Sequence, residues 1–331
     1  MYLALILACL ATLTICLLAR PLANKLKGMD LPDGERKRHK SPTPLIGGLA
    51  IAIPMLGVGL YLSTNSDIAG VYIGLSVAVA GAFLIGFADD RHDLSPTIRL
   101  FLTFVLCLGV LSNDPNLILG ILHFTFENSL SMGRWAWPFT LLSVIGFIYA
   151  FNMTDGMDGL AIGQALIWSI LLLILGGNEL NWFLIILAAV LAITLYFNLT
   201  KKLFLGDSGA YALSIIFCVI MIISHSNVPE LKSDMIFVWL LIPVLDCLRL
   251  ILTRIARGSS PLSPDNNHLH HHLSLLLPDV FVVPVILVFI ACGGVLTIIM
   301  PDQTIIWLAI SLALYFVVIV AAERVQSIQR G

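Results

Sequence analysis

The sequence predicts an all-α polytopic membrane protein with about 11 transmembrane helices. Of its 331 residues, 59% are hydrophobic and only 11% are charged, whereas soluble domains are about 25% charged. The apolar residues form long runs, and the Lys and Arg residues fall almost entirely between alternate runs. Since backbone polar groups in lipid must be satisfied within each segment, such runs are expected to cross the bilayer as helices.

Eleven apolar runs approach the roughly 20 residues that a spanning helix needs. They lie at about 2–20, 45–62, 68–88, 97–112, 136–151, 160–176, 181–197, 205–224, 235–254, 281–299 and 303–322. The stretch 115–126 is apolar but shorter and rich in β-forming residues. We expect an extramembrane hairpin or a re-entrant piece there. A twelfth span is the alternative, and it would move everything downstream to the other side of the membrane.

The distribution of basic residues favours eleven spans. With eleven, 15 of the 18 Lys and Arg residues fall on one side, Arg134 and Lys232 fall on the other, and Arg249 lies within a span. Because cytoplasmic loops carry the excess of Lys and Arg, we expect a periplasmic amino terminus and a cytoplasmic carboxyl terminus. No linker or internal repeat divides the chain, so we expect a single integral membrane domain over residues 1–331.

An acidic patch, Asp89-Asp90-x-x-Asp93, ends the run that begins at Ile68. Carboxylates at a helix C-terminus oppose the helix macrodipole, so this placement calls for a compensating cation. A hard divalent cation such as Mg²⁺ takes oxygen ligands of this kind, often while it also holds substrate phosphates. We therefore expect the patch to be part of a functional site.

Two further polar turns fall on the same predicted side. Residues 152–159 read Asn-Met-Thr-Asp-Gly-Met-Asp-Gly, so Asp155 and Asp158 alternate with glycines that let backbone approach a ligand. The following helix N-terminus favours anions. Residues 205–209 read Leu-Gly-Asp-Ser-Gly, where Asp207 is expected to cap the next helix, to bind a metal, or both.

A histidine cluster and a basic segment complete the same predicted face. Residues 264–272 hold four His within five positions. Zn²⁺ binding is one interpretation, but no Cys and no regular His spacing supports it, and hydrogen bonds to phosphate oxygens fit better. Upstream, Asp246 and Arg249 share one helical face, as a structural ion pair or with an Arg that faces a pocket. Residues 35–40, Glu-Arg-Lys-Arg-His-Lys, are either an orientation signal or a cationic approach for an anionic substrate.

These groups together favour phosphoryl chemistry. Mg²⁺ with basic residues is typical of phosphoryl transfer, and the absence of a Gly-x-x-x-x-Gly-Lys-Ser/Thr sequence excludes a P-loop ATPase. A site at the membrane interface suits one lipid phosphate and one soluble phosphate substrate. The competing class is a transporter whose carboxylates line an ion path, but only Asp246 is expected inside a span.

Five motifs, in order over about residues 20–275, resemble those of the polyprenyl-phosphate N-acetylhexosamine-1-phosphate transferases. They are Arg36-Lys37-x-His39-x-x-Pro42-x-Pro44-x-x-Gly47-Gly48, Asp89-Asp90, Asn152-x-x-Asp155-Gly156-x-Asp158-Gly159-Leu160, Phe204-Leu205-Gly206-Asp207-Ser208-Gly209 and His268-Leu269-His270-His271. The string after Arg257 is more similar to the WecA-type branch than to MraY, the muramyl-pentapeptide transferase. MraY-like use of UDP-MurNAc-pentapeptide is the alternative within the family.

The resemblance implies a reaction and its setting. Undecaprenyl phosphate and a UDP-N-acetylhexosamine, with N-acetylglucosamine the expected sugar, would give the lipid pyrophosphoryl sugar and UMP. Mg²⁺ or Mn²⁺ would be required. The enzyme would lie in the bacterial inner membrane with its site on the cytoplasmic face, and would initiate O-antigen (lipopolysaccharide) or other cell-surface polysaccharide synthesis. The oligomeric state is left open, with a homodimer as one possibility.

The resemblance also implies roles for individual residues. Asp207 is expected to be the principal metal ligand, with Asp155 next to the metal. Asp89 is expected to deprotonate or orient the lipid phosphate, with Asp90 beside it; Asp89, Asp90 and Asp155 form the expected catalytic set. The expected substrate-binding residues are Asn152, Gly156, Met157, Asp158, Asn198, Arg38, Lys40, His268, His270 and His271. A direct displacement and a covalent intermediate on Asp89 are both left open.

Overall fold

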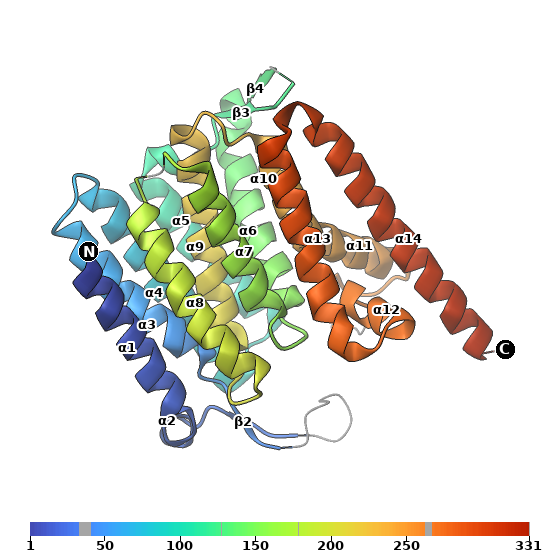
Figure 1. Cartoon of the computed structure of the whole chain (residues 1–331), viewed down its shortest axis with the longest axis horizontal. Helices are drawn as coiled ribbons and strands as arrows, with labels where there is room; N and C mark the ends of the chain where they lie inside the picture. Colours follow the sequence, from blue (N-terminus) through green and yellow to red (C-terminus); the bar gives the residue numbers. More distant parts are fainter. Residues whose placement is uncertain (33–40, 127, 178, 262–266, 331) are drawn as a thin grey trace.

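The computed structural model describes residues 1–32, 41–126, 128–177, 179–261 and 267–330 as a bundle of helices packed side by side (Figure 1). The helices are α1 Tyr2–Leu17, α2 Ala19–Leu26, α3 Gly47–Ser63, α4 Ala69–His92, α5 Pro96–Asn113, α6 Ala136–Thr154, α7 Leu160–Leu175, α8 Asn181–Leu199, α9 Gly206–Asn227, α10 Ser233–Trp239, α11 Leu241–Ala256, α12 Leu269–Leu276, α13 Asp279–Ile299 and α14 Thr304–Arg330. Short 3₁₀ turns span Pro115–Leu117, Gly133–Trp135 and Pro301–Gln303.

Each of the eleven predicted runs is occupied by helix. Within the described chain, seven helices are long and apolar enough to cross a membrane, and nine if each of two bent pairs forms one span. The apolar helices α3 and α7 are shorter, at 17 and 16 residues. The all-α, multi-pass architecture is therefore confirmed, while the number eleven and the orientation of the termini stay predictions.

Both bent pairs are explained by a proline. The α1–α2 pair bends by 70° and the α10–α11 pair by 74°. Pro21 and Pro243 each lie four residues after the last residue of the preceding helix, and a proline cannot donate a hydrogen bond to the carbonyl group four residues earlier. The carbonyl oxygen of Trp239 instead accepts a hydrogen bond from the Trp168 indole at 3.0 Å. The predicted span 235–254 is thus two helices set at an angle.

The hairpin predicted near residues 115–126 is confirmed. Strand β3 (Ile121–His123) pairs antiparallel with β4 (Ser129–Ser131). Strands of three residues are far too short to cross a bilayer, which takes about 9–11 residues, so a twelfth span at this place is wrong. A second two-stranded ribbon joins β1 (Met29–Asp30) to β2 (Thr43–Pro44). The two ribbons lie at opposite ends of the bundle (Figure 1).

Helix α9 is the centre of the bundle. It packs against α3, α4, α6 and α7, and 89% of its most apolar window is buried. A helix that is apolar all round is expected to be enclosed by others. By contrast, 17% of the corresponding window of α5 and 22% of that of α14 are buried, as expected for helices that face lipid. Since α9 begins with Gly206-Asp207, its central position places this motif among the ends of its neighbours.

Candidate active site

Within the described residues, the predicted polar motifs meet at one end of the bundle, the end that carries α2 and β2 in Figure 1; the basic segment at 35–40 lies outside the described residues. The backbone N–H groups of Gly47 and Gly48 donate to the carbonyl oxygens of Phe204 and Leu205, both at 2.9 Å, which ties the start of α3 to the start of α9. A side chain at Gly48 would lie 2.5 Å from the backbone nitrogen of Gly209. These glycines are therefore needed because two backbones touch.

Asp90 holds the start of α9 in place. Its Oδ1 accepts from the backbone N–H of Asp207 at 2.8 Å, and its Oδ2 from that of Ser208 at 3.0 Å. The first N–H groups of a helix lack partners within the helix, and an anion there is favoured by the macrodipole. Gly206, with φ of +73°, turns the chain directly beside this carboxylate. The expectation that Asp207 caps α9 is wrong, because Asp90 from α4 supplies the cap.

Asp89 is equally engaged. Its Oδ2 lies 2.6 Å from Nη1 of Arg99, and its Oδ1 accepts from the backbone N–H of Leu94 at 2.9 Å. The carboxylate is buried, whereas a quarter of the Arg99 side chain is exposed. The unfavourable position of these carboxylates at the end of α4 is thus offset by a guanidinium group and by a helix N-terminus. Each Asp89 oxygen thus has one donor, which fixes the orientation of the carboxylate.

The Asp207 carboxyl group lies against that of Asp89 and close to Arg99. Two carboxyl groups that face one another need a shared proton or a cation between them. Mg²⁺ is commonly held by only one or two protein carboxylates, together with water and substrate phosphates. Among the described residues, no three His, Cys, Asp or Glu side chains form a complete metal cage. These carboxylates fit a hard cation whose remaining coordination positions are filled by oxygens of the substrates.

The turn after α6 brings Asp155 to the same place. Partial burial, together with the negative charges of Asp158 and Asp90, raises the pKa of Asp155 to about 7. Asn152, one turn earlier, has a buried side-chain oxygen that accepts no hydrogen bond from the described part of the chain. Met157 packs partly against the hydrophobic core. This predicted turn therefore lies within electrostatic range of Asp90.

Asn198 fixes the far side of that turn. Its side-chain oxygen accepts from the backbone N–H of Gly159 at 2.6 Å, and its amide donates to the carbonyl oxygen of Leu203 at 3.0 Å. The same amide is 3.5 Å from Oδ1 of Asp158. Gly159 has φ of +85°, where a side chain would be strained. Asn198 thus lies beside this turn and shapes it, while its binding of substrate stays a prediction.

The histidines stack over the same turn. The rings of His268 and His270 are nearly parallel, at 7°, with centroids 5.5 Å apart, and His271 lies 4.2 Å from His270. A side chain at Gly156 would come within 2.5 Å of the His270 ring. The His-rich and Asp-rich motifs therefore share one end of the molecule. Predicted substrate ligands Arg38 and Lys40 lie outside the described residues.

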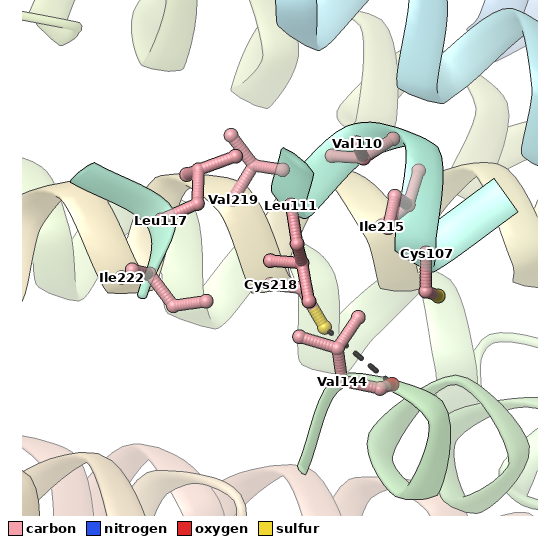
Figure 2. A pocket seen from close by; sticks show the side chains of 9 residues that line it. All are labelled: Cys107, Val110, Leu111, Leu117, Val144, Ile215, Cys218, Val219 and Ile222. Atoms are coloured by element: carbon pink, nitrogen blue, oxygen red, sulfur yellow. Dashed lines mark hydrogen bonds between the residues drawn. The ribbon is translucent and has the colours of Figure 1, made fainter. Parts of the chain in front are cut away.

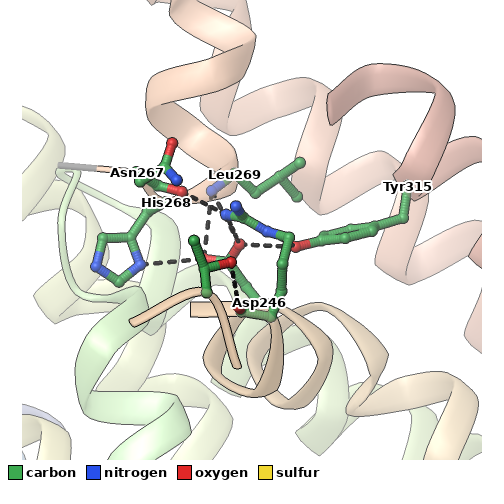
Figure 3. A network of polar contacts seen from close by, with 7 residues as sticks. Asp246, Asn267, His268, Leu269 and Tyr315 are labelled. Atoms are coloured by element: carbon green, nitrogen blue, oxygen red, sulfur yellow. Dashed lines mark hydrogen bonds and ion pairs between the residues drawn. The ribbon is translucent and has the colours of Figure 1, made fainter. Parts of the chain in front are cut away.

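A polar network around Asp246 links the histidine motif to other helices (Figure 3). Asp246 forms the expected ion pair with Arg249 at 2.9 Å, and it also accepts from Nδ1 of His268 at 3.0 Å. Sequence reasoning missed the His268 contact and the parts played by Arg99 and Tyr315. For Arg99 there was a signal: it is a lone cation at the start of an apolar run, ten residues after an acidic pair.

An apolar gap deeper in the bundle is not a substrate site. It lies between α5, α6 and α9, holds about 10 Å³, and is lined by residues such as Cys107 and Cys218 (Figure 2). This volume is about that of one water-sized probe. All six cysteines of the chain are free thiols. The chemistry is therefore expected at the polar end of the helices.

Comparison with known proteins agrees with this geometry. Residues 72–225, which include the Asp89-Asp90, Asp155 and Asp207 motifs, match the model of glycosyl transferase family 4. An undecaprenyl-phosphate alpha-N-acetylglucosaminyl 1-phosphate transferase from Escherichia coli O157:H7 is 31% identical over 270 residues, covering 76% of this chain and 71% of that protein. This chain belongs to glycosyl transferase family 4.

Two further relatives of this family 4 member have similar coverage. The Yersinia pestis protein of the same name is 29% identical over 274 residues, or 79% of this chain and 73% of that protein. A probable undecaprenyl-phosphate N-acetylglucosaminyl 1-phosphate transferase from Bacillus subtilis is 28% identical over 283 residues, or 82% and 76%. The family resemblance inferred from five short motifs is thus confirmed.

Proposed function

We propose that this protein transfers N-acetylglucosamine 1-phosphate from UDP-N-acetylglucosamine to undecaprenyl phosphate and releases UMP. The observation that carries the proposal is the joint between α4 and α9, where Asp89, Asp90 and Asp207 come together beside Arg99. The relatives named for this reaction align with the chain across this joint. A phosphoryl-transfer site needs positioning and charge neutralisation above all, and this joint supplies both.

In the proposed reaction, an oxygen of the lipid phosphate attacks the β-phosphorus of the nucleotide sugar. A new P–O bond joins the two phosphates, the bond between the α- and β-phosphates breaks, and UMP leaves with those electrons. A phosphate monoester has its second pKa near 6, so the acceptor is largely deprotonated at neutral pH. Because the acceptor then needs no base, Asp89, which is bound by Arg99 and the Leu94 N–H, would serve to orient Arg99 and the neighbouring Asp207.

Mg²⁺ would be held by Asp207 with help from Asp155, and it would neutralise charge on the bridging phosphates. Asp90 keeps the start of α9, and so Asp207, in register with α4. The histidines over the Gly156 turn would bind the diphosphate of the nucleotide sugar, and Asn198 would hold that turn rigid. The proximity of Asp207 to Asp89 and of His270 to Gly156 supports these proposed roles.

The expected setting is the bacterial inner membrane, with the site on the cytoplasmic face. The excess of basic residues near the site end supports this orientation, and UDP-sugars are soluble donors that would enter from that side. The product would be the first lipid-linked sugar of O-antigen or another cell-surface polysaccharide.

The test uses purified protein with labelled UDP-N-acetylglucosamine and undecaprenyl phosphate. We expect UMP and a lipid-linked sugar in equal amounts, and a loss of about 100-fold or more in Asp207→Asn, since electrostatic groups at a transition state contribute on this order. Asp67→Asn, an exposed change of the same type outside the acidic patch, is the matched control. Absence of lipid-linked product from the wild type, or a preference for UDP-MurNAc-pentapeptide in competition, would refute the proposal.

A further inference from the structure

The Asp246 carboxylate collects donors from three separate elements (Figure 3). Its Oδ1 accepts from Arg249 Nη2 at 2.9 Å and from the Tyr315 hydroxyl at 2.8 Å. Its Oδ2 accepts from His268 Nδ1 at 3.0 Å, and the backbone N–H of Leu269 lies 3.1 Å from Oδ1 and 3.2 Å from Oδ2. Asp246 is only 3% exposed. So many contacts on one buried carboxylate fix its position tightly.

This arrangement determines which nitrogen of His268 carries a proton. A carboxylate beside a guanidinium group is ionised and can only accept hydrogen bonds. The Nδ1 atom of His268 must therefore be the donor, and Nε2 is the nitrogen on the opposite edge of the ring. A carboxylate that holds one imidazole nitrogen sets the tautomer and the ring orientation in many enzymes. The His268 ring also stacks on His270, which lies over Gly156.

Tyr315 brings the last long helix into this network. Its hydroxyl donates to Asp246 and accepts from Arg249 Nε at 2.7 Å, and the side chain is 2% exposed. Tyr315 lies in α14, well beyond the residues 72–225 that match the family model. A hydroxyl that joins a buried carboxylate to its guanidinium partner restricts both groups. Loss of this hydroxyl would remove one of the donors that hold the carboxylate and would leave Arg249 Nε without its acceptor, so Asp246 would hold His268 less firmly.

We propose that Asp246, held by Arg249 and Tyr315, is a positioning residue that fixes His268 with its proton on Nδ1 and presents Nε2 to the diphosphate of the nucleotide sugar. This inference rests on the proposed function and adds to it a role for α14. Asp246 and Tyr315 act through His268 and do not themselves touch the substrate.

A purely architectural role is the rival explanation. Asp246 also caps the start of α12 through Leu269, and Arg249 binds the carbonyl oxygen of Asn267. If the role is architectural, Tyr315→Phe loosens all of α12, so His270 binds the nucleotide sugar less well whether or not His268 is present. Under the proposal, the effect of Tyr315→Phe passes through the His268 ring alone.

A double-mutant cycle separates the two. We expect Tyr315→Phe to lower kcat/KM for UDP-N-acetylglucosamine about tenfold, the scale of one hydrogen bond to a charged group. In a His268→Ala background, the same change should cost less than about twofold, because groups that act as a unit are not additive. Tyr61→Phe, an exposed change near the opposite end of α3, is the matched control and should leave activity unchanged.

Equal losses from Tyr315→Phe in the two backgrounds would overturn the proposal in favour of the architectural role. Thermal unfolding of each purified variant reports whether it is folded, and the cycle is repeated with Asp246→Asn so that the result does not depend on one variant. Additive effects of Asp246→Asn and His268→Ala in this second cycle would also overturn the proposal. A wild-type protein without transferase activity would instead refute the proposed function, so the two failures are distinguishable.

Discussion

The capping of α9 by Asp90 can be tested with Asp90→Asn. The two Asp90 oxygens accept from the N–H groups of Asp207 and Ser208 at 2.8 and 3.0 Å. An asparagine has almost the same shape, but its amide group offers only one acceptor and turns an N–H₂ group toward the second backbone donor. One buried backbone N–H therefore loses its partner.

The expected cost follows from these contacts. Loss of one hydrogen bond to a charged group costs about 1.5–3 kcal/mol, and removal of a negative charge from a helix N-terminus costs about 0.3–1 kcal/mol more. We expect the free energy of unfolding to fall by about 2–4 kcal/mol. Transferase activity should fall as well, because Asp207 lies in the first turn of the loosened helix.

The assay is unfolding in mixed detergent and SDS micelles, followed by circular dichroism. Asp93→Asn is the control: Asp93 is exposed, and its φ of +46° is a conformation that Asn tolerates, so a change within about 0.5 kcal/mol is expected. If Asp90→Asn were as stable as this control, the cap would contribute nothing and the reasoning would be refuted.

Three other predictions concern the turn, the ion pair and the metal. Gly156→Ala would push its methyl group into the His270 ring, 2.4 Å away. We expect this change to raise KM for UDP-N-acetylglucosamine about tenfold, the scale of a small misplacement in a site. Gly146→Ala, whose methyl group meets nothing within 4 Å, is the control and should leave KM unchanged. Arg99→Gln leaves the buried Asp89 without its cation and should lower kcat by about 100-fold, with partial recovery in Arg99→Lys; unchanged kcat in both would contradict the role of the pair. EDTA should abolish activity and added Mg²⁺ should restore it, whereas full activity in EDTA would remove the metal from the proposal.

Much of the fold could be predicted from the sequence because the bilayer fixes the length of a spanning segment and requires its backbone hydrogen bonds to be made internally. Apolar runs of about 20 residues become helices. A hairpin or re-entrant piece was expected at 115–126 because that run is short and rich in β-formers, and the strands lie at 121–123 and 129–131. The bends at Leu18 and Leu240 were missed although Pro21 and Pro243 were visible. Pro54 and Pro284 lie inside α3 and α13, so a proline by itself does not show where a helix breaks. At Pro243, the freed carbonyl group of Trp239 accepts from the Trp168 indole, 71 residues away along the chain.

For the polar residues, too, part of the arrangement could be predicted from the sequence and part could not. The sequence predicted which motifs belong to the site, since the types and order of Asp155, Asp207 and His270 specify a chemistry. It offered a cap by Asp207 as one interpretation beside metal binding, whereas Asp90 supplies the cap from 117 residues away. Capping rules consider only side chains that are near in sequence. The start of a central helix is also surrounded by the ends of other helices, and their side chains can lie closer to it.

Residue composition and run length alone therefore indicated a multi-pass helical membrane protein, and the resemblance of five motifs to a known family indicated a sugar-phosphate transferase. Only the tertiary structure decided that Asp89 is paired with Arg99, that Asp90 secures α9, and that Asp246 ties His268 to Tyr315. The physical reason is that a buried carboxylate must find donors wherever packing brings them, and packing joins segments whose separation along the chain carries no information about their distance in space.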